Sequence, residues 1–218
     1  EGNIRLAEQP DLKSLLTVRP AAPAVLTAPA AITFHGYRNE GGYAGTRNLL
    51  GIVPTVQCVA GVLNKAVEQI RKELLPRFPN VSDVTVINHA YGCGVAIDAP
   101  EAVIPIRSLQ NLLEHPNFGG EPLIVGLGCE KLTPLMLAGP DRVNEAVILR
   151  EHNGYHAMIA AIMAQAEVKL RRLDRRRREE LPLSDLLIGM QCGGSDAFSG
   201  MTANPAAGFA ADLLVAAG

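Results

Sequence analysis

The sequence predicts an α/β fold, with a mainly parallel sheet flanked by helices on both faces in a Rossmann-like three-layer architecture. From Ile32 onward, short apolar runs alternate with longer amphipathic runs, which is the pattern of strands alternating with helices. Most of the short runs are apolar at every position, as expected for parallel strands that are covered on both sides. With 218 residues, the chain is long enough to bury a substantial core.

The elements follow in order along the chain. Residues 1–31 are predicted to form a linker or a surface strap, because the stretch SLLTVRPAAPAVLTAPAA is rich in Pro and Ala and has little periodicity. Residues 32–218 are predicted to form the domain. Its strands are expected at 49–53, 84–88, 122–127, 146–149 and 186–190. Its helices are expected at 59–75, 99–113, 155–178 and 205–217.

Charge and hydropathy exclude several kinds of partner. The formal net charge is −2, from 20 basic and 22 acidic residues, which gives no electrostatic reason to expect nucleic acid or an anionic membrane. The basic run KLRRLDRRRREE is interpreted as a solvated helix face, since acidic residues dilute it. No apolar run reaches the roughly 18 to 20 residues that cross a bilayer. The first residues also lack the features of a signal peptide, and the protein is therefore predicted to be cytoplasmic.

The four cysteines each lie just beyond a predicted strand or at its end. They are Cys58, Cys93, Cys129 and Cys192. They form no CxxC pair, and a chain of this size needs no disulfides, so reduced thiols are expected. In a parallel sheet, ligands bind at the carboxyl ends of the strands. The four thiols are therefore expected to approach one crevice.

Two strand exits combine a thiol with a second chemical group. NHAYGCG places His89 and Cys93 four residues apart, and imidazole and thiolate are both good ligands for a divalent metal. GLGCEKL offers Cys129 and Glu130. The alternatives left open are a packed cysteine beside a histidine that hydrogen-bonds a turn, and a glutamate that caps the following helix.

A third strand exit, QCGGSD, contains Cys192, Gly193, Gly194, Ser195 and Asp196. The two glycines could expose backbone N–H groups as a nest for a carboxylate. Alternatively, Ser195 or Asp196 caps the next helix.

The glycine-rich stretch GYRNEGGYAGTRNLLG precedes a strand, whereas a dinucleotide fingerprint follows a strand and opens a helix. Its arginines, Arg38 and Arg47, could form bidentate pairs with a substrate carboxylate. Surface solvation or an ion pair is the alternative.

Four blocks together resemble a known family. GYRNEGGYAGTRNLLGI, NHAYGCGVAIDAP, NFGGEPLIVGLGCEKL and MQCGGSDAFSGMTANPAAG are similar to the signature blocks of the galactarate dehydratase and altronate dehydratase family of sugar-acid dehydratases. The resemblance covers residues 32–218 and is strongest to members that act on galactarate. Members are longer, and the start at Glu1 without Met leads us to expect a central-domain piece that is joined to the remaining domains of its parent chain. Such a piece could be inactive without those domains.

The resemblance implies a hydro-lyase that dehydrates a sugar diacid, with galactarate expected, to a 2-keto-3-deoxy aldarate. It also implies a divalent metal, Fe²⁺ or another ion such as Mn²⁺, because a cation stabilises the dianionic enediolate while a base removes the weakly acidic proton. The candidate catalytic residues are His89, Asp196 and Glu130. The candidate metal ligands are Cys93, Cys129, Cys192 and His89. The candidate substrate-binding residues are Arg47, Asn48, Gly193, Gly194 and Ser195. A homo-oligomer is compatible with this reading.

Three alternatives stay open at this point. The enzyme could act on altronate or another hydroxy acid. The four thiols could hold an iron–sulfur cluster, although their spacing matches no recognised cluster motif. Finally, the domain could be a non-catalytic scaffold whose glycines serve turns and whose cysteines only fill space.

Overall fold

The computed structural model describes residues 32–91, 97–194 and 197–217. The chain divides into two compact units. One unit is Thr33–Met190, and the other includes residues 191–218. We describe each unit by itself.

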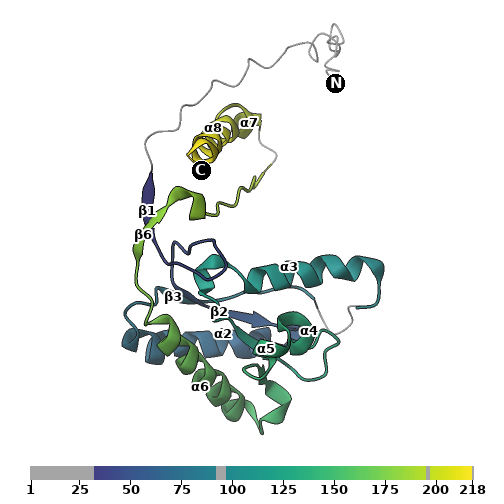
Figure 1. The fold of residues 1–218 in the computed structure, drawn as a ribbon. Coiled ribbons are helices and arrows are strands. Elements are labelled where there is room, and N and C mark those ends of the chain that lie inside the picture. The colour runs from purple at the N-terminus through teal and green to yellow at the C-terminus, as the bar shows by residue number, and fades with distance from the viewer. Residues whose placement is uncertain (1–31, 92–96, 195–196, 218) are drawn as a thin grey trace, which may run out of the picture. The chain divides into compact units, whose positions relative to one another are not determined.

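A four-stranded parallel sheet forms the centre of the first unit (Figure 1). Its strands, in spatial order, are β3 (Asp83–Val86), β2 (Leu49–Pro54), β4 (Leu123–Gly126) and β5 (Val147–Ile148). Every neighbouring pair is parallel. The structure therefore confirms the predicted α/β class and four of the five predicted strands. The Rossmann-like detail stays a prediction.

Helices cover both faces of this sheet. On one face, α2 (Ala60–Gln69) and α6 (Tyr155–Leu173) pack against alternate strand residues such as Leu50 and Ile52. On the other face, α3 (Val103–Leu113) and α4 (Pro134–Ala138) pack against Val53 and Ile124. The alternation follows from the strand geometry, because successive side chains point to opposite faces. Each face of the sheet consequently has its own apolar core.

Short elements complete the first unit. They are α5 (Pro140–Val143), a π-helical turn (Ile70–Leu74) and 3-10 turns at Gln57–Val59, Leu75–Arg77, Pro100–Ala102, Pro116–Phe118, Leu149–Glu151 and Leu183–Asp185.

A two-stranded antiparallel ribbon was not predicted from the sequence. It pairs β1 (Thr33–Gly36) with β6 (Glu179–Pro182). The helix predicted to reach residue 178 ends at Leu173. Residues 179–182 form the strand β6, whose pairing with β1 requires extended backbone that a helix cannot provide. The prediction for this end of the helix was wrong.

The strand predicted at 186–190 is also wrong. Of these residues only Leu186 pairs, in a single bridge with Ala44. Leu187, Ile188 and Met190 are exposed, so this apolar run lacks the two covered faces that a central strand requires.

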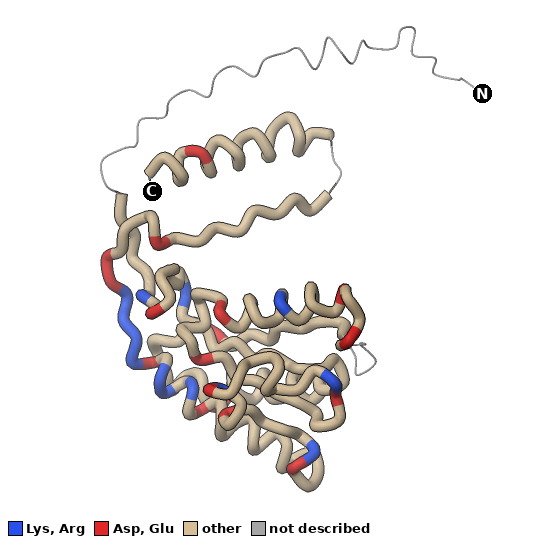
Figure 2. Tube along the Cα trace, turned by 45° about the vertical axis from the view of Figure 1, so that its right-hand side comes forward, with Lys and Arg blue, Asp and Glu red and all other residues tan. Residues whose placement is uncertain are grey.

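Some arginines of the basic run form hydrogen bonds and ion pairs with other segments, which a solvated helix face alone does not predict. Arg178 donates to the carbonyls of His35 and Thr46 at 2.8 Å each, and Arg172 pairs with Glu121 and Glu145. Figure 2 shows the basic positions following one another along the end of α6 and the segment after it. These arginines therefore connect α6 to other parts of the first unit.

In the second unit, α7 (Ala197–Met201) precedes α8 (Ala203–Ala216), which confirms the helix predicted at 205–217. Within the described ranges, no helix of either unit is both long and apolar enough to span a membrane.

Candidate active site at the carboxyl edge of the sheet

Three loops leave neighbouring strands β2, β3 and β4 at the same edge of the sheet, because these strands are parallel. Backbone hydrogen bonds connect them. The N–H of Thr55 donates to the carbonyl of Val125 at 3.0 Å, and the N–H of Gln57 donates to the carbonyl of Tyr91 at 2.9 Å. The loops form one connected platform at the edge where ligands bind in parallel sheets, and the ligand site itself stays a prediction.

Glu130 lies inside this platform and is only 8% exposed. Its Oε1 accepts hydrogen bonds from the hydroxyl of Thr55 at 2.5 Å and from the N–H of Leu127 at 3.1 Å. Its Oε2 accepts from the N–H groups of Gly128 at 2.6 Å and Cys129 at 2.9 Å. Burial alone would raise the pKa of Glu130, but the Thr55 hydroxyl and the backbone amides outweigh it and lower this pKa below its ordinary value. Glu130 is therefore an ionised carboxylate at neutral pH.

Glycines make room for this carboxylate. A Cβ at Gly126 would lie 2.5 Å from Oε1 of Glu130, and Gly128 has a φ of +103°, which side chains other than glycine rarely adopt. The alternative role of Glu130 as a helix cap is wrong. Helix α4 is capped by Thr133, whose hydroxyl accepts from the N–H of Met136.

His89 connects the loop after β3 to the end of β2. Its Nε2 lies 2.8 Å from the carbonyl of Pro54, and its Nδ1 accepts from the N–H of Tyr91 at 3.1 Å. Because a carbonyl can only accept and an amide N–H can only donate, these partners fix the neutral tautomer with the proton on Nε2. These two bonds agree with the sequence-based alternative of a hydrogen-bonded histidine, and the base and ligand roles of His89 stay predictions.

Of the thiols that the sequence predicts for this edge, the structure describes Cys58 and Cys129 in the first unit. Cys58 and Cys129 follow the adjacent strands β2 and β4, and both are exposed. Cys93 lies outside the described residues. Within the described parts of the chain, no three His, Cys, Asp or Glu side chains form a group that could hold a metal ion. The donors seen at this edge thus do not by themselves fit a metal site, and the predicted ligand set stays a prediction.

A small cavity lies beneath the platform. Its volume is about 20 Å³, and it is lined by Thr55, Tyr91 and Glu130 together with apolar residues that include Ile106 and Leu109 of α3. A cavity needs about 10–15 Å³ to hold one water molecule. This cavity therefore has room for about one water molecule. Sequence reasoning missed Thr55 and Tyr91, although both occur just after predicted strands, which was the available signal.

Arg47 and Asn48 lie at the opposite edge of the sheet, because they precede β2 whereas Glu130 follows β4. A six-residue strand separates its two ends by about 20 Å. Asn48 is fully buried and donates to the carbonyls of Asn80 at 2.8 Å and Leu173 at 2.9 Å. The backbone N–H of Arg47 donates to Oδ1 of Asn117. The structure therefore does not bring these two candidates together with His89.

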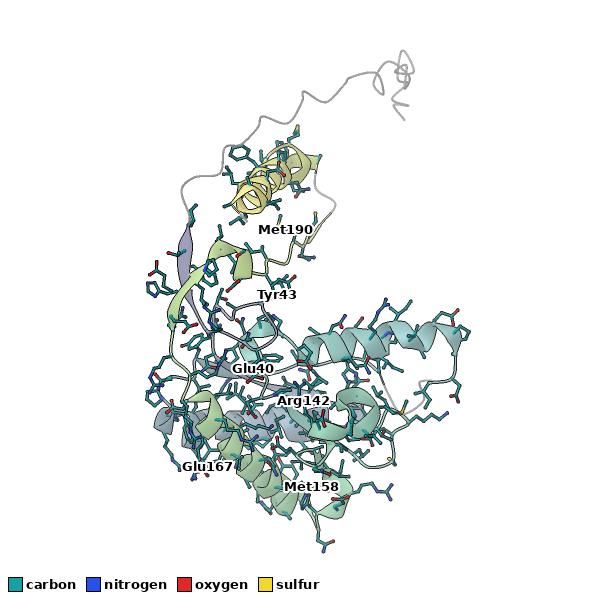
Figure 3. The ribbon with its side chains drawn as sticks, in the orientation of Figure 1. Glu40, Tyr43, Arg142, Met158, Glu167 and Met190 are labelled. Atoms are coloured by element: carbon teal, nitrogen blue, oxygen red, sulfur yellow. The ribbon has the colours of Figure 1, made fainter. Side chains whose placement is uncertain are left out.

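A larger cavity of about 860 Å³ lies at this amino-terminal edge. Its wall includes Glu40, Tyr43 and Arg142, which Figure 3 labels, and the half-buried Arg176. Arg142 forms an ion pair with Glu114. Arg38, a further candidate for carboxylate binding, pairs with Glu179 and with Asp185, which is the ion-pair alternative. Sequence reasoning missed Arg176, which lies within the basic run.

In the second unit, the QCGGSD segment is described as far as Gly194. The thiol of Cys192 lies 3.6 Å from the carbonyl of Gly194 and 3.9 Å from Nδ2 of Asn204. Ser195 and Asp196 lie outside the described residues. The roles predicted for this segment, including the Gly193 and Gly194 nest, stay predictions.

Two family models match the chain. Residues 36–174 match the second domain of D-galactarate dehydratase/altronate hydrolase, and residues 183–218 match the C-terminal region of D-galactarate/altronate dehydratase. The chain belongs to this family. The two matches leave residues 175–182 between them. This interval follows the end of α6 and contains the ribbon strand β6.

Among curated members of the family, galactarate dehydratase (L-threo-forming) of Escherichia coli K12 is 49% identical over the whole chain. Altronate dehydratase of Bacillus subtilis strain 168 is 40% identical over 85% of the chain, and altronate dehydratase of E. coli K12 is 34% identical over 84%. The chain spans 43%, 37% and 36% of these three relatives, respectively.

Proposed function

We propose that this chain is part of a hydro-lyase that dehydrates galactarate. The observation that carries the proposal is the 49% identity to a galactarate dehydratase across both units, compared with 40% and 34% to altronate dehydratases over a smaller share of the chain. The connected platform at the carboxyl edge supports it, because a site built on strand-end loops is held in place before the substrate binds.

The proposed reaction removes the proton next to one carboxylate and expels the hydroxyl group of the neighbouring carbon as water. The resulting enol becomes a 2-keto-3-deoxy diacid. The proton is weakly acidic, so the site needs a base within hydrogen-bond reach and positive charge or N–H donors facing the developing enediolate. We place this chemistry at the platform of the first unit, where the thiol of Cys129 is exposed.

A divalent cation, Fe²⁺ or Mn²⁺, remains part of the proposal. It would supply positive charge to the enediolate. Metal analysis of the full-length protein, purified without oxygen, is expected to find about one such ion per chain. A metal-free preparation with full activity would contradict this part of the proposal alone.

The substrate is tested with the full-length protein and three sugar acids: galactarate, glucarate and altronate. The formation of 2-keto acid is followed with a carbonyl reagent. We expect the highest kcat/KM with galactarate. A preference for altronate would overturn the assignment of the substrate while leaving a sugar-acid dehydratase, and no product from any of the three would overturn the dehydratase itself.

A further inference from the structure

We propose that Glu130 and His89 are positioning residues that hold the strand-end loops in place, and that neither accepts the substrate proton or binds the metal. The inference rests on the proposed function, and it concerns the two titratable side chains that the sequence makes the first candidates for proton transfer at this edge. The hydrogen bonds of these two side chains support the inference.

Glu130 has no lone pair to spare. An ionised carboxylate offers about four acceptor sites, two on each oxygen. Oε1 accepts from the Thr55 hydroxyl and the Leu127 N–H, and Oε2 accepts from the N–H groups of Gly128 and Cys129. All four sites are therefore occupied by groups of the chain itself.

Three of these donors are consecutive backbone amides, Leu127 to Cys129. Successive N–H groups of this kind form a nest that binds an anion, and here the chain's own carboxylate fills it. If Glu130 turned toward a substrate, three part-buried amide donors would lose a charged acceptor. The bonds instead fix the loop that carries the exposed thiol of Cys129.

His89 is occupied in the same way. A neutral imidazole has one N–H and one lone pair. The N–H on Nε2 is directed at the carbonyl of Pro54, and the lone pair on Nδ1 takes the N–H of Tyr91. No lone pair remains for a proton or a metal ion, while the ring joins the loop after β3 to the end of β2.

The first experiment substitutes Glu130 in the full-length protein. Glu130→Gln keeps the shape but places an NH₂ group where two N–H donors converge, so the loop should loosen. We expect the alkylation of Cys129 by iodoacetamide, followed by peptide mass spectrometry, to accelerate at least about fivefold. Thr55→Val removes one of the four donors and should shift the rate in the same direction by less. Glu68→Gln, which alters an exposed residue of α2 paired with Lys65, is the matched control.

The second experiment substitutes His89. Asn places an oxygen near the position of Nδ1 and can accept from Tyr91, while Gln places an NH₂ group near Nε2 and can donate to Pro54. Neither is a base. We expect His89→Asn and His89→Gln to keep kcat/KM within about tenfold of the wild type, with the same limbs in the pH profile and the same metal content, and His89→Ala to lose more.

Other outcomes would overturn the inference. Loss of a proton acceptor costs about 10²- to 10⁴-fold in rate. If Glu130→Gln loses that much in kcat while Cys129 alkylation is unchanged, Glu130 is a base. If both conservative variants of His89 lose it together with one limb of the pH profile, or lose the metal, His89 is a base or a ligand. Should the wild type dehydrate no sugar acid, the alkylation rates and metal contents still decide the positioning roles.

Discussion

Nη1 of Arg176 donates a hydrogen bond of 3.0 Å to Oδ1 of Asn48, across 128 residues of sequence. The same guanidinium donates to the carbonyl of Arg38 and to Oδ1 of Asn39, and it lies over the ring of Tyr37. Burial lowers the pKa of Arg176 below its ordinary value, but an arginine remains charged at any physiological pH. This hydrogen-bonded group connects the glycine-rich block to the end of α6.

Asn48→Ala should destabilise the first unit by about 2–4 kcal/mol, because it removes three hydrogen bonds and leaves the carbonyl of Asn80 and part of a guanidinium without those partners, while the carbonyl of Leu173 keeps the N–H of Arg176. Urea unfolding measures the loss. Asn64→Ala, at an exposed position of α2, is the control and should be neutral or slightly stabilising. A stable Asn48→Ala protein that has lost substrate affinity would instead support the substrate-binding role predicted from the sequence.

Gly119→Ala and Gly120→Ala form a matched pair. Both glycines have positive φ, +58° and +74°, but a Cβ at Gly119 would collide with the guanidinium of Arg176, whereas one at Gly120 meets nothing within 4 Å. We expect Gly120→Ala to cost about 1 kcal/mol from backbone strain alone, and Gly119→Ala to cost at least 1 kcal/mol more because of the overpacking. Equal losses in urea unfolding would show that Arg176 moves aside freely.

Glu145→Gln tests the charge cluster around the buried Lys169, which pairs with Glu121 and Glu145. The hydrogen bond from Lys169 lowers the pKa of Glu145 below 4.5. A carboxyl group whose pKa is lowered by folding contributes stability above its unfolded pKa, and loses it as the pH falls through the folded pKa.

The wild type should therefore exceed Glu145→Gln by about 1–2 kcal/mol at pH 7. The difference should shrink as the pH falls from about 4.5 toward 3. Urea unfolding at several pH values provides the measurement. Glu101→Gln, at an exposed position, should stay within about 0.5 kcal/mol of the wild type throughout. A difference that stays constant between pH 7 and 3 would rule out this ionisation as its source.

Thr55→Val removes the hydroxyl donor to Glu130 and nearly preserves the volume of the side chain. Thr55 is 2% exposed, and a hydrogen bond to a charged acceptor is worth about 1.5–3 kcal/mol. We expect a loss of that size in thermal or urea unfolding. Thr55→Ser keeps the hydroxyl and should lose less, about 1 kcal/mol for the missing methyl group. If Val and Ser are equally destabilising, packing rather than the hydrogen bond stabilises this position.

The central sheet could be predicted because its signal is local. The runs around Leu50, Val84 and Ile124 are apolar on both faces, and such runs are typical of buried parallel strands. The ribbon could not be predicted, since Thr33–Gly36 and Glu179–Pro182 carry no strong alternation and are defined by pairing across most of the chain. The strand predicted at 186–190 was wrong because its apolar composition favours a buried strand, whereas only Leu186 pairs, in a single bridge with Ala44.

For the candidate site, strand order correctly placed His89, Cys129 and Glu130 on one edge. Strand order could not predict that the side chains of Glu130 and His89 are fully hydrogen-bonded. Their amide donors depend on the local backbone conformation, which amino-acid composition does not encode. Asn48 was grouped with them through family resemblance, although its position before β2 already indicated the other edge. Cys93, Ser195 and Asp196 lie outside the described residues, so their roles stay predictions.

The pairing of Thr33 with Pro182 has a consequence for synthesis in the cell. Ribosomes add roughly 5–20 residues per second, so β1 leaves the ribosome on the order of 10 s before its partner exists. During that interval its backbone N–H and C=O groups can pair with any available strand edge. Chaperone binding to the nascent chain should therefore be strongest before β6 is translated, and a stop codon placed just before Glu179 should yield an aggregation-prone product even though the four-stranded sheet is complete.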